Sequence, residues 1–201
     1  MAQSNQLDRR LFIAGLTSTA ALSAAPAYAL SGGQAEQLVN AAVSDINTII
    51  ASGKSTSRML ADFEKVFARY ADVNIIALTT LGAARRGVPK AEINAYVKVF
   101  RGYFTRKYGK RFNEFVGGQI TVTGSRAAKS SIEVLSTAKL RGSSPFKVNW
   151  LVSDRSGKPK IFNIIIEGVN TLTSERAEIG AMLDRRGGSI ARLTADLQKA
   201  G

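Results

Sequence analysis

The sequence contains no cysteine and no histidine. Without thiolate or imidazole groups, the chain cannot build a Ser-His-Asp or Cys-His nucleophile system, a zinc site of the usual kind or a cysteine-ligated iron–sulfur cluster. Any catalysis would therefore depend on carboxylate, lysine, tyrosine or serine side chains. The missing cysteines also remove the usual sequence indicator of redox compartment.

Acidic side chains and proline are also scarce. The chain has 28 Lys and Arg against 15 Asp and Glu, a formal net charge of +13 at pH 7. This balance favours an anionic partner, and nucleic acid and membrane lipid both qualify. With 201 residues, 45% of them hydrophobic, and only 4 Pro, the composition is typical of one compact domain. It excludes a disordered tail or a collagen-like fibre.

The N-terminus has the pattern of a cleaved export signal. Arg9 and Arg10 precede an apolar stretch over residues 11–25, which is shorter than the roughly 20 residues of a transmembrane helix. The A-x-A sequence at residues 27–29 then fits signal peptidase, so we predict a signal peptide over 1–29 and one domain over 30–201. Residues 8–13 resemble the twin-arginine signal, although Asp8 stands where Ser or Thr is usual, so the general secretory route remains open. Both routes lead to the bacterial periplasm.

Apolar residues recur at helical spacing in six stretches. The spacing predicts helices over residues 34–51, 57–70, 73–81, 93–108, 174–183 and 189–197. Pro89 suits the first turn of the fourth helix, because its missing N–H would have no intrahelical partner there. One face of that helix is rich in aromatic side chains, a pattern that fits either an ordinary core helix or a ligand-lining helix. Its apolar stripe consists of Ile93, Tyr96, Val97, Phe100, Phe104 and Tyr108.

After Gln119 the period changes to alternation of apolar and polar residues, which indicates strands with one apolar face. These strands lie around residues 120–123, 132–135, 146–153 and 160–167. The turn-forming run at 154–159 predicts an antiparallel hairpin between the last two. Helices and strands occur in blocks, so the sequence predicts an α+β fold. It has an antiparallel sheet of about four strands, packed against N- and C-terminal helices.

Two functional classes gain little support from the residues. Glu167 is the only acid whose neighbours suggest burial, and one carboxylate is not a catalytic mechanism, so we expect a structural role for it and no enzyme activity. Residues 85–111 are strongly basic with interleaved tyrosines, a pattern that suits nucleic-acid binding. An exported protein rarely meets nucleic acid, and a solvated helix face explains the same residues.

Lipid binding explains more features together. If the helices stand slightly off the sheet, apolar side chains on the sheet and on the fourth helix would enclose a cavity for acyl chains. The candidate tail-lining residues, each of which would equally suit a plain core, are Val97, Phe100, Phe104, Val148, Trp150, Val152, Ile164 and Ile166. A basic rim would meet a phosphate headgroup or an anionic membrane surface. Its candidate residues are Arg101, Arg106 and Lys107.

The C-terminal third resembles the MlaC family of periplasmic phospholipid-binding proteins, also called toluene-tolerance auxiliary proteins. The matching features, in order, are Glu167-Gly168-Val169 at a strand end, Arg176, Gly187 or Gly188, and the apolar residues of a final helix at 193–197. The similarity extends more loosely back to about residue 35. The sequence departs from the family pattern at Asn163, Asn170 and Glu175, where Asp, Ser and Tyr are frequent.

The resemblance implies a lipid shuttle that needs no cofactor and binds a diacyl phospholipid with its tails inside. Its implied partners are an inner-membrane ABC transporter complex with its substrate-binding subunit and an outer-membrane lipoprotein complex, and its implied role is to maintain outer-membrane lipid asymmetry. One alternative is an exported small-molecule-binding or enzymatic domain of a cone-shaped α+β class. That class would need a polar group deep in the pocket, which the alternation places only at Asn163 or Glu167. A basic polyanion-binding protein is the other alternative.

Overall fold

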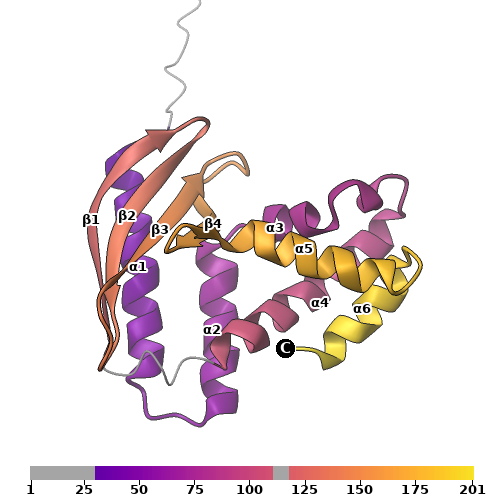
Figure 1. Ribbon diagram of the computed structural model, residues 1–201, viewed down its shortest axis with the longest axis horizontal. Helices are drawn as coiled ribbons and strands as arrows, with labels where there is room; N and C mark the ends of the chain where they lie inside the picture. The colour runs from indigo at the N-terminus through magenta and orange to yellow at the C-terminus, as the bar shows by residue number, and fades with distance from the viewer. Residues whose placement is uncertain (1–29, 111–117) are drawn as a thin grey trace, which may run out of the picture.

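The computed structural model describes residues 30–110 and 118–201, so the predicted signal peptide lies outside the described residues. Figure 1 shows the sheet at one end of the molecule and a group of helices at the other. The elements are α1 (Gly32–Ile50), α2 (Thr56–Tyr70), α3 (Val73–Leu81), the 3-10 helix η1 (Gly82–Arg85), α4 (Lys90–Gly109), β1 (Gln119–Ala128), β2 (Ser131–Lys139), β3 (Phe146–Ser153), β4 (Lys160–Ile166), β5 (Val169–Asn170), α5 (Thr171–Asp184) and α6 (Ile190–Lys199).

The strands form one antiparallel sheet in the order β1-β2-β3-β4-β5, which confirms the α+β prediction and the β3–β4 hairpin. The sheet has five strands rather than about four. The extra strand, β5, spans only two residues and pairs with the end of β4. A strand of two residues is too short to show an alternating pattern, so the sequence did not predict it. The connecting turn holds Glu167 and Gly168 at φ angles of 49° and 81°, as a tight hairpin turn requires.

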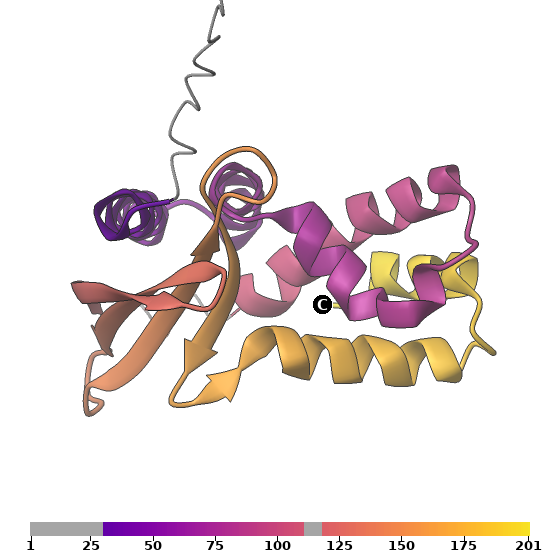
Figure 2. The same ribbon diagram turned by 90° about the horizontal axis from the view of Figure 1, so that it is seen from above.

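The first hydrophobic core joins α1 to the sheet. Figure 2 shows α1 and α2 seen end-on above one face of the sheet. Helix α1 begins in a capping box between Ser31 and Gln34. Most of its buried residues are Ala or Val, and these let the helix approach the strands closely. This sheet core consists of Ala35, Val39, Ala42, Val43, Val134, Ala138, Val148, Trp150, Val152 and Ile161.

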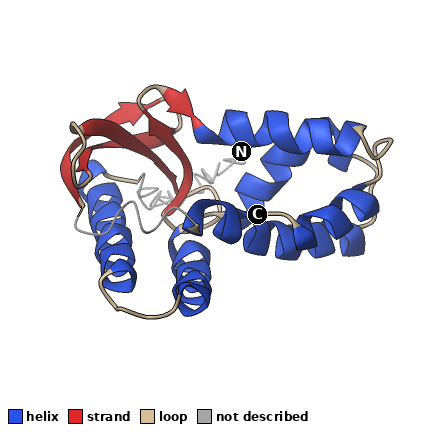
Figure 3. Cartoon of the chain, turned by 60° about the horizontal axis from the view of Figure 1, so that its bottom comes forward, coloured by secondary structure: helices blue, strands red, loops and turns tan. Residues whose placement is uncertain are grey.

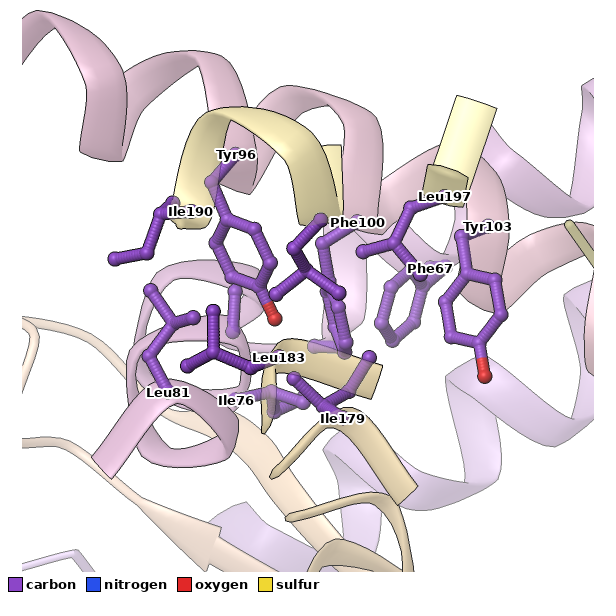
Figure 4. Packing of buried hydrophobic residues seen from close by; sticks show 13 residues of the cluster. Phe67, Ile76, Leu81, Tyr96, Phe100, Tyr103, Ile179, Leu183, Ile190 and Leu197 are labelled. Atoms are coloured by element: carbon purple, nitrogen blue, oxygen red, sulfur yellow. The ribbon is translucent and has the colours of Figure 1, made fainter. Parts of the chain in front are cut away.

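A second, helical core forms where α3, α4, α5 and α6 pack together with the end of α2 (Figure 4). Tyr96 and Phe100 of α4 lie at its centre with no exposed surface. The Tyr96 hydroxyl shares a 2.7 Å hydrogen bond with Thr80 Oγ1. Burial raises the pKa of Tyr96, so its phenol stays protonated. The aromatic stripe predicted for this helix therefore faces mainly into a helical core.

Strand β4 connects the two cores. The backbone N–H of Asp72, at the junction of α2 and α3, donates to the Ile161 carbonyl over 2.8 Å, and Asp72 Oδ1 caps α3 by accepting from the Ile75 N–H. At its other end, β4 leads through β5 directly into α5. Figure 3 shows the α1–α2 pair and the helical group projecting from the sheet as two separate arms.

Two details differ from the alternation that the sequence predicts. The β3–β4 register shifts between Leu151 and Val152, so that Ile161 rather than Phe162 lies opposite Val152. Glu167, expected to be buried, is exposed in the β4–β5 turn, where its carboxylate accepts from the backbone N–H of Lys147. The prediction of burial was wrong because the strand ends one residue earlier.

Asn163 provides a test of the junction between β4 and α5. Its side chain donates to Asn170 Oδ1 over 2.9 Å and accepts from the backbone N–H groups of Ile164 and Leu172 over 2.8 and 3.0 Å. We expect Asn163→Ala to lower the free energy of unfolding by about 2–4 kcal/mol, because buried partners lose their hydrogen bonds. Urea denaturation measures the effect. The exposed Asn94→Ala is the control and should stay within about 0.5 kcal/mol of the wild type; equal effects would contradict this role.

Candidate ligand cavity

An apolar cavity of about 130 Å³ lies between the sheet core and the helical core. Its walls come from α1, α2, α3, α4, β3, β4 and α5. Because neither core fills this space, it is the best candidate for a ligand site in the part of the chain that the structure describes. The lining residues are Ala42, Ile46, Phe63, Val66, Phe67, Tyr70, Ala71, Ile76, Phe104, Trp150, Ile161, Phe162, Asn163, Ile164, Thr171, Leu172 and Glu175.

Helix α2 contributes the longest stretch of wall. Four of its residues, at positions 63, 66, 67 and 70, lie three and four apart and so share one helix face. The Phe67 ring stacks on Phe104 of α4, with centroids 4.6 Å apart and planes at 7°. Phe104 in turn contacts Tyr108 at 4.4 Å. Together the three rings form a continuous aromatic row between α2 and α4.

Three of the eight predicted tail-lining residues line this cavity: Phe104, Trp150 and Ile164. The structure places the other five elsewhere. Phe100 lies in the helical core, Val148 and Val152 lie in the sheet core, Val97 lines a separate polar recess, and Ile166 is 38% exposed at the end of β4. Contact of any of the eight with a lipid tail stays a prediction.

Sequence reasoning missed the α2 residues and Glu175 as parts of the site. The spacing on α2 already predicted one apolar face. The two phenylalanines and the tyrosine on that face were the sequence feature that could have indicated a ligand-lining helix. Glu175 gives no such signal, because its partners come from α4.

Glu175 is an acidic side chain only 1% exposed at the wall of the cavity. Its Oε1 accepts from Lys107 Nζ over 2.5 Å and from the Tyr108 hydroxyl over 2.6 Å. Lys107 also donates to Glu178 Oε2 over 2.5 Å, and the Tyr103 hydroxyl donates to Glu178 Oε1 over 2.9 Å. We call these five residues the Glu175 cluster.

The environment of the Glu175 cluster keeps its donors protonated. Burial, together with the neighbouring carboxylates, raises the pKa of Tyr103 and of Tyr108. Burial alone would lower the pKa of Lys107, but its hydrogen bonds to Glu175 and Glu178 outweigh that effect, so this pKa is raised. Burial also raises the pKa of Glu178, but the hydrogen bonds from Lys107 and Tyr103 lower it by more, so the net effect is a lowered pKa.

The three predicted docking residues all have partners within the molecule. Arg101 Nε donates to Glu64 over 2.7 Å, Arg106 donates to the carbonyls of Leu197 and Ala200 at the end of α6, and Lys107 belongs to the Glu175 cluster. Arg101 also lines a polar recess of about 550 Å³ that shares Ala71 with the cavity. The other basic residues of this recess are Lys98, Lys158 and Lys160.

Within residues 30–110 and 118–201, no helix has both the length and the apolar character needed to cross a bilayer.

Comparison with known proteins gives a family match for the sequence and structural matches for the fold. The family described as "MlaC protein" matches residues 36–199. A phospholipid-binding protein from Ralstonia solanacearum, solved in complex with a phospholipid, is 18% identical in sequence with a TM-score of 0.69, over 81% of this chain and 98% of that one. At this identity the structural likeness shows the fold alone. No curated protein matches the sequence.

Removing Lys107, the cation of the Glu175 cluster, should lower the stability of the fold considerably. We expect Lys107→Ala to lower the free energy of unfolding by about 3–5 kcal/mol, because it leaves the buried Glu175 carboxylate without its counter-charge. Chemical denaturation measures this cost. Lys98→Ala, an exposed lysine of the same helix, serves as the control and should have little effect. A Lys107→Ala protein as stable as the Lys98→Ala protein would show that the ion pair contributes nothing.

Proposed function

The chain belongs to the MlaC family, and on that premise we propose that it binds a diacyl phospholipid and carries it between membranes. The observation that carries this proposal is the apolar cavity between the two cores. The fold shared with a protein solved in complex with a phospholipid supports it. A binding and transport role needs no catalytic residue, which agrees with the absence of histidine and cysteine from the sequence.

The hydrophobic effect supplies the affinity for acyl chains. Each CH₂ group moved from water to an apolar site contributes about 0.8 kcal/mol, so even part of one chain favours the protein. An apolar cavity of ~150 Å³ in another protein holds a benzene molecule. The present cavity is of similar order, so two acyl chains require α1 and α2, or the aromatic side chains between the arms, to move apart.

The polar recess offers a place for the phosphate of the headgroup. It adjoins the cavity at Ala71, and it brings Lys98, Arg101, Lys158 and Lys160 together beside one acid, Asp72. A phosphate there would meet several cations while its acyl chains enter the cavity. Near an anionic membrane surface each Lys or Arg adds about 1 kcal/mol to the attraction, so the same residues would favour docking.

The cellular setting follows from the export signal predicted at residues 1–29 and from the family. We place the mature protein in the periplasm, between an outer-membrane lipoprotein complex and an inner-membrane ABC transporter complex with its substrate-binding subunit. A chain that withdraws phospholipid at one membrane and delivers it at the other would maintain outer-membrane lipid asymmetry.

Native mass spectrometry of the mature protein, purified from cells without detergent, tests the proposal directly. We expect diacyl phospholipid to co-purify at about one molecule per chain, because the apolar cavity between the two cores would hold the acyl chains of one lipid. Organic extraction and lipid analysis would identify it. An empty chain that also takes up no phospholipid from vesicles would refute the proposed function.

Two phenylalanines on α4 make it possible to distinguish a residue of the cavity wall from a residue of the core. Phe104 lines the cavity, whereas Phe100 is buried in the helical core. Phe104→Ala and Phe100→Ala should each lower the free energy of unfolding by about 3–5 kcal/mol. Only Phe104→Ala should also reduce phospholipid affinity per folded molecule, by about tenfold.

The readout for this pair is bound phospholipid per folded chain after incubation with vesicles. Phe→Leu substitutions at both positions replace any alanine variant that fails to fold. Equal retention by the two variants would show that Phe104 belongs to the core alone.

A further inference from the structure

One oxygen of the buried Glu175 carboxylate has no hydrogen-bond partner in the part of the chain that the structure describes. Oε1 accepts from Lys107 and Tyr108, but Oε2 is buried and accepts no hydrogen bond from any residue that the structure describes. Glu175 is at the cavity wall. Oε2 exposes almost no surface, so a donor reaches it only when the cavity widens around a ligand. Because a buried acceptor without a donor is costly, a ligand that brings a donor to Oε2 gains a hydrogen bond that the described residues do not supply.

The other polar side chains of the cavity wall are already engaged. The Tyr70 hydroxyl donates to Asp45 over 2.8 Å, the Trp150 Nε1–H donates to Ser136 Oγ over 3.0 Å, and the Thr171 hydroxyl donates to the Ile164 carbonyl over 2.8 Å. Asn163 is held in the β4–α5 junction. Among the described residues, the cavity wall thus has a single unpaired side-chain acceptor in apolar surroundings.

The acceptors left open in the Glu175 cluster determine which donor fits. Lys107 already donates to both Glu175 and Glu178, and each of these carboxylates also accepts from one tyrosine hydroxyl. An ammonium group brings three donors and would find one free acceptor here. A hydroxyl brings one donor and no charge, and it can be carried on an otherwise apolar chain or ring. The geometry therefore matches a hydroxyl better than a cation.

We propose that the cavity selects lipids that carry a hydroxyl group on their apolar part, and that this hydroxyl donates to Glu175 Oε2. The inference rests on the proposed lipid-binding function and makes it more specific. A plain methylene chain would fill the same space and leave the carboxylate oxygen unpaired. Sites built to bond a hydroxyl discriminate strongly against analogues that lack it, because the buried polar group is then left without a partner.

Competition between matched fatty acids tests the selection. The purified protein is incubated with equimolar octadecanoic acid and one of its 2-, 3-, 10- or 12-hydroxy derivatives, and native mass spectrometry gives the ratio of the two complexes. Both competitors carry the same carboxylate, so the ratio isolates the hydroxyl. We expect one position along the chain to favour binding by about tenfold or more, since a hydrogen bond to a charged acceptor is being formed.

Two variants at the site and one matched control complete the experiment. Glu175→Leu should remove the preference or reverse it, because the hydroxyl then has no acceptor, while octadecanoic acid still binds. The near-isosteric Glu175→Gln replaces the charged acceptor with an amide and should reduce the preference; it keeps the test valid if the Leu variant does not fold. Glu178→Gln alters the same cluster on the same helix, but Glu178 does not line the cavity, so the preference should survive.

A ratio near one for every derivative in the wild type, as expected if water satisfies Oε2, would overturn the selection. A preference that persists in both Glu175 variants would overturn it as well. A protein that binds phospholipid without preferring hydroxylated chains retains the proposed function and loses only this inference. A protein that binds neither fatty acids nor phospholipid loses both.

Discussion

Strand β4 has to serve two hydrophobic cores at once, and the rest of the structure depends on that constraint. One face of the strand completes the sheet core beside Trp150, while its backbone is bonded to the α2–α3 junction through Ile161. Its end leads directly into α5, which belongs to the helical core. The cavity lies where the two cores meet along this strand, and its apolar lining follows from the faces that form it.

The basic residues of α4 show how net charge and surface charge differ. The sequence is strongly basic between residues 85 and 111, yet Arg106 holds the last carbonyls of α6, and Lys107 neutralises buried and half-buried carboxylates. These side chains stabilise the helical core and are already engaged in contacts within the protein. Lys98 and Lys158, which line the polar recess, form no ion pair with another of the described residues. The number of basic residues in a helix sequence therefore does not indicate which of them are available to bind an anion.

Periodicity predicted the secondary structure because each helix and long strand has one face that must be buried. The helix predicted at 73–81 has those bounds in the structure, and the β3–β4 hairpin forms at its predicted turn. The same reasoning could not separate core from cavity, since Phe100 and Phe104 lie on one helix with the same spacing and only the packing of α2 distinguishes them. Glu175 was out of reach for a further reason: its partner Lys107 is 68 residues away in the chain.

An apolar cavity and a single unpaired oxygen have different effects on binding. Hydrophobic burial is non-directional and scales with the area removed from water, so the wall formed by Phe67, Phe104 and Trp150 favours any acyl chain of suitable size. Specificity is a difference between affinities, and it arises where one ligand satisfies a buried group that another leaves unpaired. Under the proposed selection, the Glu175 carboxylate is the group that would make such a difference in this cavity. A general lipid carrier and a selective one would then differ by one side chain on the same fold.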